Sequence, residues 1–192
     1  MEQTRRGFLK WCTSSALSAV AISPPARIIT QINPVKPLPR PQLHTDSTKL
    51  ISLVNLKTGE KLLDCPFQVN GNTCPDAAKA LKQLLRDHRT NVSHAMDSKL
   101  FELLHSIQTS LETTEPLQVI SGYRCAKTNR MLKGAKRSYH MRGQAIDIIQ
   151  PDRSIKQLTK AALLQRAGGV GGYADFVHVD TGPLRKWGRV SV

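Results

Sequence analysis

Ser138-Tyr139-His140-Met141-Arg142-Gly143-Gln144-Ala145-Ile146-Asp147, read together with Phe176-Val177-His178-Val179-Asp180, is the stretch that decides how this chain is expected to fold. His140, His178 and Asp147 offer two imidazoles and a carboxylate, a three-ligand set that binds zinc and leaves the fourth tetrahedral position open to water. Structural zinc sites are normally closed by four protein ligands, so the open set indicates hydrolytic chemistry.

The spacing of these ligands explains how they can converge. Residues 143–149 read as a strand, because a glycine opens the run and small or branched apolar residues fill it. Side chains alternate along a strand, so Asp147 lies on one face, and His140 precedes the strand on a turn that can fold back over that face. Residues 176–180 read as a second strand that carries His178. If these two strands are neighbours, all three ligands converge with an acid beside them.

The pattern Ser-x-His-x-x-Gly-x-Ala-x-Asp, followed by a distal His-x-Asp, resembles peptidase family M15. This family of zinc peptidases includes D-Ala-D-Ala carboxypeptidases, D-Ala-D-Ala dipeptidases and murein endopeptidases. Further matches, over residues 51–187 in all, resemble the twin-arginine-exported, DUF882-like murein endopeptidase branch: Ile120–Arg124, Ala167–Gly171 and Phe176–Pro183. The resemblance implies a hedgehog/D-Ala-D-Ala peptidase-like α+β fold, in which a small, mostly antiparallel sheet carries the zinc site and helices pack on one side.

The same resemblance suggests which acid takes the proton of the attacking water. Asp180 lies two residues after His178 and on the same strand face. Asp175 lies three residues before His178, where related carboxypeptidases and dipeptidases carry Glu. We favour Asp180, because its counterpart belongs to the endopeptidase motif. The alternative is that Asp180 orients a ligand imidazole.

The resemblance also implies residues that contact the substrate. In the related dipeptidases an Arg at the position of Arg124 stabilises the reacting oxygen or binds a terminal carboxylate, as its bidentate fork allows. Ser138 either binds a substrate carboxylate or shapes the turn, Gln144 is a hydrogen-bond donor near the ligands, and Tyr123 adjoins Arg124. We count Ser138, Tyr123 and Gln144 as substrate-binding candidates.

Hydrophobic periodicity and turn residues predict the remaining elements. They predict a hairpin over 50–57 and 60–63, helices over 75–89, 97–111, 126–132 and 154–166, and a strand over 117–121. Gly168–Gly172 is predicted to be a glycine-rich turn that forms a pocket wall. Trp187 is predicted to pack in the core. The pattern contains no internal repeat and no second folded domain.

The N-terminus has the features of an export signal. Thr4–Lys10 contains a twin-arginine motif, and residues 11–22 form a moderately apolar run that is too short for an ordinary membrane span. We predict a twin-arginine signal peptide over 1–26, a proline-rich linker over 27–48 and a zinc peptidase domain over 49–192. The mature protein is then periplasmic, and it meets the membrane only through the signal during export.

The export signal determines how the charge and the cysteines are interpreted. The net charge is +14, of which +12 falls after residue 26, and the anionic cell wall is the polyanion expected in the periplasm. The exported start and an aromatic content of 5% argue against nucleic-acid binding. Cys65 and Cys74 flank a turn-rich segment, which allows a local disulfide between them or, alternatively, zinc ligation, and the sequence leaves the pairing open. Cys125 stands where the family usually has Ser, and it is either a free thiol near the metal or a buried inert one.

Taken together, these features predict a zinc metallopeptidase with one Zn²⁺ per chain that cuts peptide cross-links between peptidoglycan stems. The alternatives are a D-Ala-D-Ala carboxypeptidase and a metal-containing wall-binding module without catalysis. The motifs do not distinguish a D-Ala–diaminopimelate cross-link from one between two diaminopimelates, and they leave the oligomeric state open.

Overall fold

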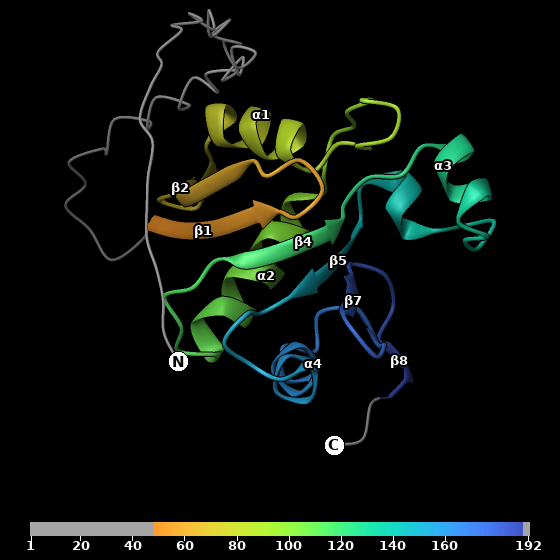
Figure 1. Ribbon diagram of the computed structural model, residues 1–192. Helices are drawn as coiled ribbons and strands as arrows, with labels where there is room; N and C mark the ends of the chain where they lie inside the picture. The colour runs from red at the N-terminus through yellow and green to blue at the C-terminus, as the bar shows by residue number, and fades with distance from the viewer. Residues whose placement is uncertain (1–47, 190–192) are drawn as a thin grey trace, which may run out of the picture. The chain divides into compact units, whose positions relative to one another are not determined.

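An eight-stranded sheet runs through residues 48–189, the part of the chain that the computed structural model describes (Figure 1). The strand order is β3-β2-β1-β4-β5-β7-β6-β8. The strands are β1 (Thr48–Asn55), β2 (Lys61–Val69), β3 (Asn72–Thr73), β4 (Leu117–Ser121), β5 (Ala145–Ile149), β6 (Gly169–Gly172), β7 (Val177–Asp180) and β8 (Arg185–Gly188). The predicted signal peptide and all but the last residue of the predicted linker lie outside the described residues.

Four α-helices and one 3₁₀ helix join these strands. They are α1 (Pro75–Leu84), α2 (Ser98–Ser110), α3 (Ala126–Met131), the 3₁₀ helix η1 (Tyr139–Arg142) and α4 (Ile155–Leu164). The predicted α+β class is therefore confirmed. Within residues 48–189, no helix has both the length and the apolar character that a membrane span requires.

The sheet is mixed, so the predicted mostly antiparallel arrangement is wrong. β1 pairs with β4 in parallel, and β6 pairs with β8 in parallel, whereas the other neighbouring strands are antiparallel. The first parallel pair arises because α1 and α2 lie between β1 and β4 in the chain, a crossover long enough to return the chain in the same direction. The second arises because β8 adds to the outer edge of β6 rather than to β7, which it follows in sequence.

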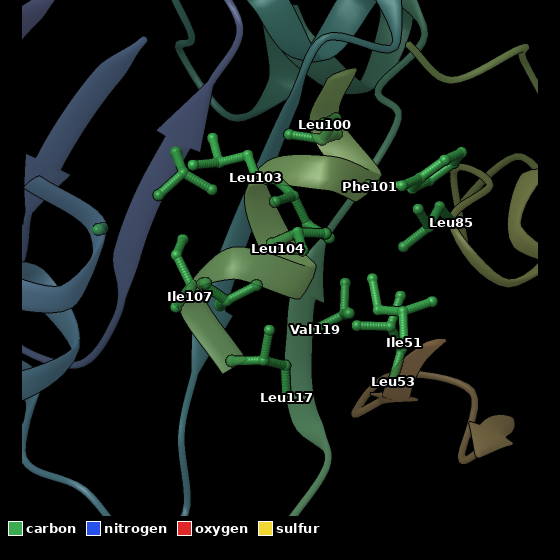
Figure 2. Packing of buried hydrophobic residues seen from close by; sticks show 14 of the residues in the cluster. Ile51, Leu53, Leu85, Leu100, Phe101, Leu103, Leu104, Ile107, Leu117 and Val119 are labelled. Carbon is green, nitrogen blue, oxygen red and sulfur yellow. The ribbon is translucent and has the colours of Figure 1, made fainter. Parts of the chain in front are cut away.

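Helix α2 covers the central strands with an apolar stripe (Figure 2). The stripe consists of Leu100, Leu103, Leu104 and Ile107, all of them fully or almost fully buried. It packs against strand residues of the same cluster, namely Ile51 and Leu53 on β1 and Leu117 and Val119 on β4. Burial of each such side chain contributes about 1.5–3 kcal/mol. This cluster fixes the sheet on which the functional residues stand.

The two faces of strands β5 and β7 have different roles. Ile146 and Ile148 of β5 and Val177 and Val179 of β7 are fully buried in the apolar cluster. Because side chains alternate along a strand, the intervening positions of β5 and β7 point to the opposite face. Those positions carry the predicted metal ligands Asp147 and His178. The apolar core on one face of β5 and β7 therefore supports the polar site on the other face.

The helix boundaries agree with the predictions except at the end of α1. Asp97 caps α2, since its side chain accepts a hydrogen bond from the Lys99 N–H at 3.0 Å, and Ser154 begins α4 with a capping box. Helix α1 ends at Leu84, five residues before the predicted end. The chain turns away there because the Leu85 carbonyl accepts a hydrogen bond from the Tyr123 N–H at 2.8 Å.

Strand β2 extends to Val69, well beyond the predicted hairpin end at residue 63, and the two cysteines near it are not bonded to each other. Cys65 lies on the buried face of β2, whereas Cys74 is the N-cap residue of α1. Both thiols are free, so the local disulfide that the sequence allowed is not formed. Burial raises the pKa of the Cys65 thiol to about 11, which keeps it protonated and unreactive near neutral pH.

Asp87 ties the loop after α1 to the start of α3. Its carboxylate is buried and accepts hydrogen bonds at 3.0 Å from the backbone N–H groups of Cys125 and Arg89. Burial alone would raise its pKa, but hydrogen bonds from Thr128, Cys125 and Arg89 outweigh burial and hold the pKa below its usual value. Asp87 thereby fixes the segment that carries Arg124.

We predict that Asp87→Asn destabilises the protein by about 1–3 kcal/mol at pH 7, because an amide cannot accept from all these donors. The folded-state pKa of Asp87 lies below the unfolded value of 3.8, so the wild-type advantage is complete above pH 3.8 and is lost as pH falls through the folded pKa. Urea unfolding of both proteins at pH 7 and pH 3 measures this. Asp76→Asn, at an exposed position of α1, is the control. Equal stability of Asp87→Asn and wild type at pH 7 would contradict the assignment.

Candidate functional site

One row of cross-strand partners runs over five neighbouring strands, β4, β5, β7, β6 and β8. Ser121 on β4 is paired with Asp147 on β5, Asp147 with His178 on β7, His178 with Gly171 on β6, and Gly171 with Trp187 on β8. Cross-strand partners point to the same face of a sheet, so these side chains share the face opposite the helices. The register therefore confirms that the two predicted ligand strands are neighbours.

His140 reaches this row from η1, the 3₁₀ helix that precedes β5. The turn ends at Gly143, whose φ of 68° reverses the chain into the strand. His140 is buried, and its Nδ1 lies 2.7 Å from the carbonyl oxygen of Gly122. A carbonyl only accepts, so Nδ1 carries the proton and the lone pair of Nε2 faces the row.

Three donor atoms meet at one point in front of β5 and β7. His140 Nε2 and His178 Nδ1 lie 3.1 Å apart, and the same Asp147 oxygen lies 3.2 Å from the first and 2.9 Å from the second. Their side chains are 3%, 12% and 4% exposed for His140, His178 and Asp147. Among the described residues, this is the one group of three metal-ligating side chains with donor atoms within 4.8 Å of one another.

The chemistry of this donor set fits a divalent cation such as zinc. Two imidazole nitrogens and a carboxylate oxygen face the same point, and three electron-pair donors held together in a buried place require a proton or a metal ion between them. The outward nitrogens are both engaged: His140 Nδ1 with Gly122, and His178 Nε2 with Asp180 Oδ2 at 3.0 Å. This is the arrangement in which outer partners orient metal-binding imidazoles.

Asp180 is fully buried, and protein groups surround its carboxylate. Oδ2 accepts from His178 Nε2 and from Arg185 Nη2 at 2.6 Å. Oδ1 accepts from Arg185 Nη1 at 3.0 Å and from the backbone N–H groups of Gly169 at 3.2 Å and Gly182 at 2.8 Å. Five donors use the carboxylate completely, and the contact with His178 is the one expected of an orienting residue, the alternative weighed from the sequence.

The electrostatics of the four groups follow from burial and their mutual contacts. Burial lowers the pKa of His140, and Asp147 only partly offsets this. Burial would raise the pKa of Asp147, but the two histidines and Arg124 hold it below its usual range. Burial would also lower the pKa of His178, but hydrogen bonds to Asp147 and Asp180 raise it. Burial would raise the pKa of Asp180, but hydrogen bonds from His178, Arg185 and Gly182 hold it at about 2.

Arg124 contacts the ligand set directly. Its Nη2 donates to Asp147 Oδ2, the carboxylate oxygen that faces away from the imidazoles, and its Nε donates to Ser121 Oγ at 2.7 Å. The side chain is only 16% exposed, so it is not a surface arginine at a turn. Nη1 makes no hydrogen bond with any residue from 48 to 189, which leaves N–H groups of the fork for a substrate oxygen.

The other predicted residues lie at the borders of the site. Ser138 precedes η1 without capping it, and Tyr123 stacks on the exposed ring of His94 with centroids 4.7 Å apart. Gln144 lies between η1 and β5, and its side-chain amide is 3.5 Å from Asp97 Oδ2. Asp175 is exposed in the turn between β6 and β7, and within the described part of the chain its carboxylate has no hydrogen bond or ion pair.

Two predictions about the C-terminal strands are wrong. The glycine run is not a turn: Gly169–Gly172 forms strand β6, which pairs with β7 and β8. Trp187 is not a core residue: it lies partly exposed on β8, its ring centroid is 5.3 Å from that of His178, and its Nε1 donates to the Tyr173 hydroxyl at 3.1 Å. Trp187 thereby adds an aromatic ring beside His178, whereas Gly171 places only backbone in the row.

Comparison with known proteins agrees with this geometry. Residues 43–187 match the family model described as "Peptidoglycan L,D-endopeptidase MepK". The chain belongs to this family. It is 42% identical over 160 residues to the peptidoglycan L,D-endopeptidase MepK of Escherichia coli strain K12, which covers 78% of this chain and 87% of that protein. It is 39% identical over 151 residues to a Haemophilus influenzae protein named "Probable peptidoglycan L,D-endopeptidase MepK", covering 74% and 81%.

Membership of the L,D-endopeptidase family confirms the resemblance to peptidase family M15, whose members are generally zinc-dependent. Sequence reasoning missed two contributors to the site, Arg185 and the Gly122 carbonyl. A backbone carbonyl leaves no trace in a sequence pattern. Arg185 could have been noticed as a cation five residues after Asp180, but only the pairing of β8 with β6 brings it across to that carboxylate.

Proposed function

We propose that this protein is a zinc-dependent endopeptidase that hydrolyses L,D cross-links between peptidoglycan stems. The observation that carries the proposal is the convergence of His140 Nε2, His178 Nδ1 and Asp147 Oδ1 in a chain of the L,D-endopeptidase family. An L,D bond joins a carbonyl on an L centre to a nitrogen on a D centre. Of the two cross-links that the motifs leave open, the one between two diaminopimelates has this stereochemistry.

His140, Asp147 and His178 would hold one zinc ion per chain. Zinc bound there would supply a Lewis acid that activates water and polarises the scissile carbonyl. The protein prepares the site by fixing both imidazole tautomers, one through Gly122 and one through Asp180. The three ligand side chains are at most 12% exposed, and exclusion of bulk water strengthens electrostatic contacts at the reacting bond.

Arg124 has two roles in this proposal. By binding Asp147 Oδ2, it leaves Oδ1 directed at the imidazoles. Its unengaged N–H groups are then available to the negative charge that develops on the scissile carbonyl oxygen, or to a carboxylate of the substrate. Tyr123 adjoins Arg124 in the chain, and Ser138 and Gln144 flank the segment that carries His140; we propose that these three residues contact the peptide stem.

Asp175 is proposed as the group that takes the proton from the attacking water and passes it to the leaving amine. Support comes from the difference between the two acids. Asp180 accepts five hydrogen bonds and is fully buried, whereas Asp175 is exposed in the turn three residues before His178. Asp180 then acts by orienting His178.

We propose that this activity is periplasmic, on the basis of the net charge and the export signal. A net charge of +12 after residue 26 favours contact with the anionic wall. The twin-arginine motif at Thr4–Lys10 is proposed to carry the folded protein across the membrane. The homologous endopeptidases, which by name act on peptidoglycan, are consistent with this location.

Digestion of purified cross-linked muropeptide dimers tests the function. We expect the protein to convert dimers linked between two diaminopimelates into monomers, to leave D-Ala-linked dimers intact, and to lose activity with a chelator until zinc is restored. Chromatography with mass spectrometry identifies the bond from the product masses. Removal of a terminal D-Ala alone would indicate a carboxypeptidase, and intact dimers with a zinc-loaded protein would indicate a wall-binding module.

We predict that Asp175→Asn lowers kcat by about 10²–10⁴-fold, the usual contribution of general acid–base catalysis, without changing bound zinc. Asp180→Asn is the matched comparison, because it removes the same charge from the same hairpin but should weaken zinc binding. Zinc content by atomic absorption and steady-state hydrolysis of one dimer separate the two effects. Full activity of Asp175→Asn would exclude Asp175 as the base.

A further inference from the structure

The glycines of β6 create a gap between the metal-ligand strand and the edge of the sheet. Gly169 and Gly171 lie between β7 and β8, on the face that carries Asp180 and His178. A methyl group at Gly169 would lie 2.5 Å from Arg185 Nη1 and 2.6 Å from Asp180 Oδ2. Strand β6 thus lacks side chains where a side chain from β8 passes over it to reach β7.

Arg185 uses this gap to bind Asp180 with both ends of its guanidinium fork. Nη2 lies 2.6 Å from Oδ2 and Nη1 lies 3.0 Å from Oδ1. The guanidinium also lies against two aromatic rings, 4.8 Å from the centroid of Tyr139 and 5.0 Å from that of Trp187. Two oxygens and two rings determine the position of the fork, although part of the side chain is exposed.

Hydrogen bonds connect Arg185 through the Asp180 carboxylate to the imidazole of His178, whose Nδ1 is the candidate metal ligand. Asp180 Oδ2 accepts from both Arg185 Nη2 and His178 Nε2. With Nε2 protonated and held by Asp180, the lone pair of His178 lies on Nδ1, which faces His140 Nε2 and Asp147 Oδ1. The orientation of the ligand imidazole therefore depends on a carboxylate that Arg185 holds in place.

We infer that Arg185 is a positioning residue for the metal site, setting its zinc affinity through Asp180 and His178 across the glycine gap of β6. This inference rests on the metal site of the proposed function. A lysine at this position could bind one oxygen but could not reproduce the bidentate, stacked contact. A neutral amide would leave Asp180 without its cation, so that the carboxylate would be free to change its position.

Zinc affinity of the full chain, measured by competition with a chromogenic chelator, tests the inference. We expect Arg185→Gln to raise the zinc dissociation constant about tenfold, the lower end of the range for residues behind metal ligands, and Arg185→Lys to raise it less. Lys186→Gln is the matched control. It removes a neighbouring cation from the same strand, but Lys186 pairs with Val170 whereas Arg185 pairs with Gly169, and neighbouring side chains on a strand point to opposite faces. Its affinity should equal that of the wild type.

Kinetics with saturating zinc provide a second measurement that distinguishes positioning from substrate binding. For a positioning residue, saturating zinc should restore most of kcat in Arg185→Gln, and KM for the dimer should stay unchanged. A raised KM with unchanged zinc affinity would overturn the inference and assign Arg185 to the substrate. Should Arg185→Gln fail to fold, as thermal unfolding would reveal, an unchanged zinc affinity of Arg185→Lys would overturn it equally. Absence of zinc binding by the wild type would instead refute the proposed function.

Discussion

Asp147→Ala is expected to abolish stoichiometric zinc binding and to lower hydrolysis of the cross-linked dimer by more than about a thousandfold. The oxygen that lies 2.9 Å from His178 Nδ1 and 3.2 Å from His140 Nε2 disappears, so the site retains only two neutral nitrogen donors. Loss of a Lewis acid removes several kcal/mol of transition-state stabilisation, and each 1.4 kcal/mol or so is a factor of ten in rate. Metal analysis of the purified protein and the dimer digest measure both effects.

Two further variants make this result specific. His140→Ala should have the same effect as Asp147→Ala, because it removes another member of the same set. His105→Ala removes an imidazole that is hydrogen-bonded to the Leu50 carbonyl, away from the ligand row, and should keep one zinc per chain. Asp147→Ala also leaves Arg124 without its carboxylate, so circular dichroism must confirm that the variant is folded. Full zinc content in folded Asp147→Ala and His140→Ala would refute the ligand set.

The convergence of His140, Asp147 and His178 could be predicted from the sequence because their geometry is encoded locally. Asp147 and His178 each stand on a short strand whose alternation assigns a face, and His140 precedes the first strand by a turn. Once β5 and β7 pair, the register places Asp147 opposite His178. The family pattern added the expectation that the strands are neighbours.

The parts that could not be predicted depend on contacts between distant segments. Strand β8 has four residues, among them Arg185 and Lys186, and no alternation that would mark it as a strand. The β6 glycines favour a turn when considered alone, since glycine is depleted in strands. They form a strand here because β7 and β8 pair with both edges of β6 and the side chains of β8 lie over it.

The role of Asp180 shows the same limit at the level of a single side chain. Its position two residues after His178 predicts proximity to the candidate ligands, and Asp180 Oδ2 does lie 3.0 Å from His178 Nε2, but proximity does not distinguish a base from an orienting group. Only the hydrogen bonds to Arg185, Gly169 and Gly182 show that the carboxylate is fully used. The motif identifies an aspartate at position 180, whereas the hydrogen-bond partners of its carboxylate determine whether it can act as a base.

Gly168→Ala is expected to destabilise the protein by about 3 kcal/mol and to lower its melting temperature by about 10 °C. Gly168 precedes β6 with a φ of 156°, and a methyl group there would lie 1.7 Å from the backbone carbonyl oxygen of Asp180. A backbone oxygen cannot rotate away as a side chain can, so β6 and β7 must separate at the residue that orients His178.

Gly59→Ala separates the cost of backbone conformation from the cost of this contact. Gly59 also has a positive φ, 73°, but no atom lies within 4 Å of the position a methyl group would occupy. It should cost only about 1–2 kcal/mol, the penalty of a left-handed conformation. Urea unfolding with a chelator present gives the stability difference free of metal binding, which would otherwise stabilise the folded state. If Gly168→Ala lowers the free energy of unfolding no more than Gly59→Ala does, the strands relax around the methyl group. In that case the close approach of β6 to Asp180 is not the reason that this position requires glycine.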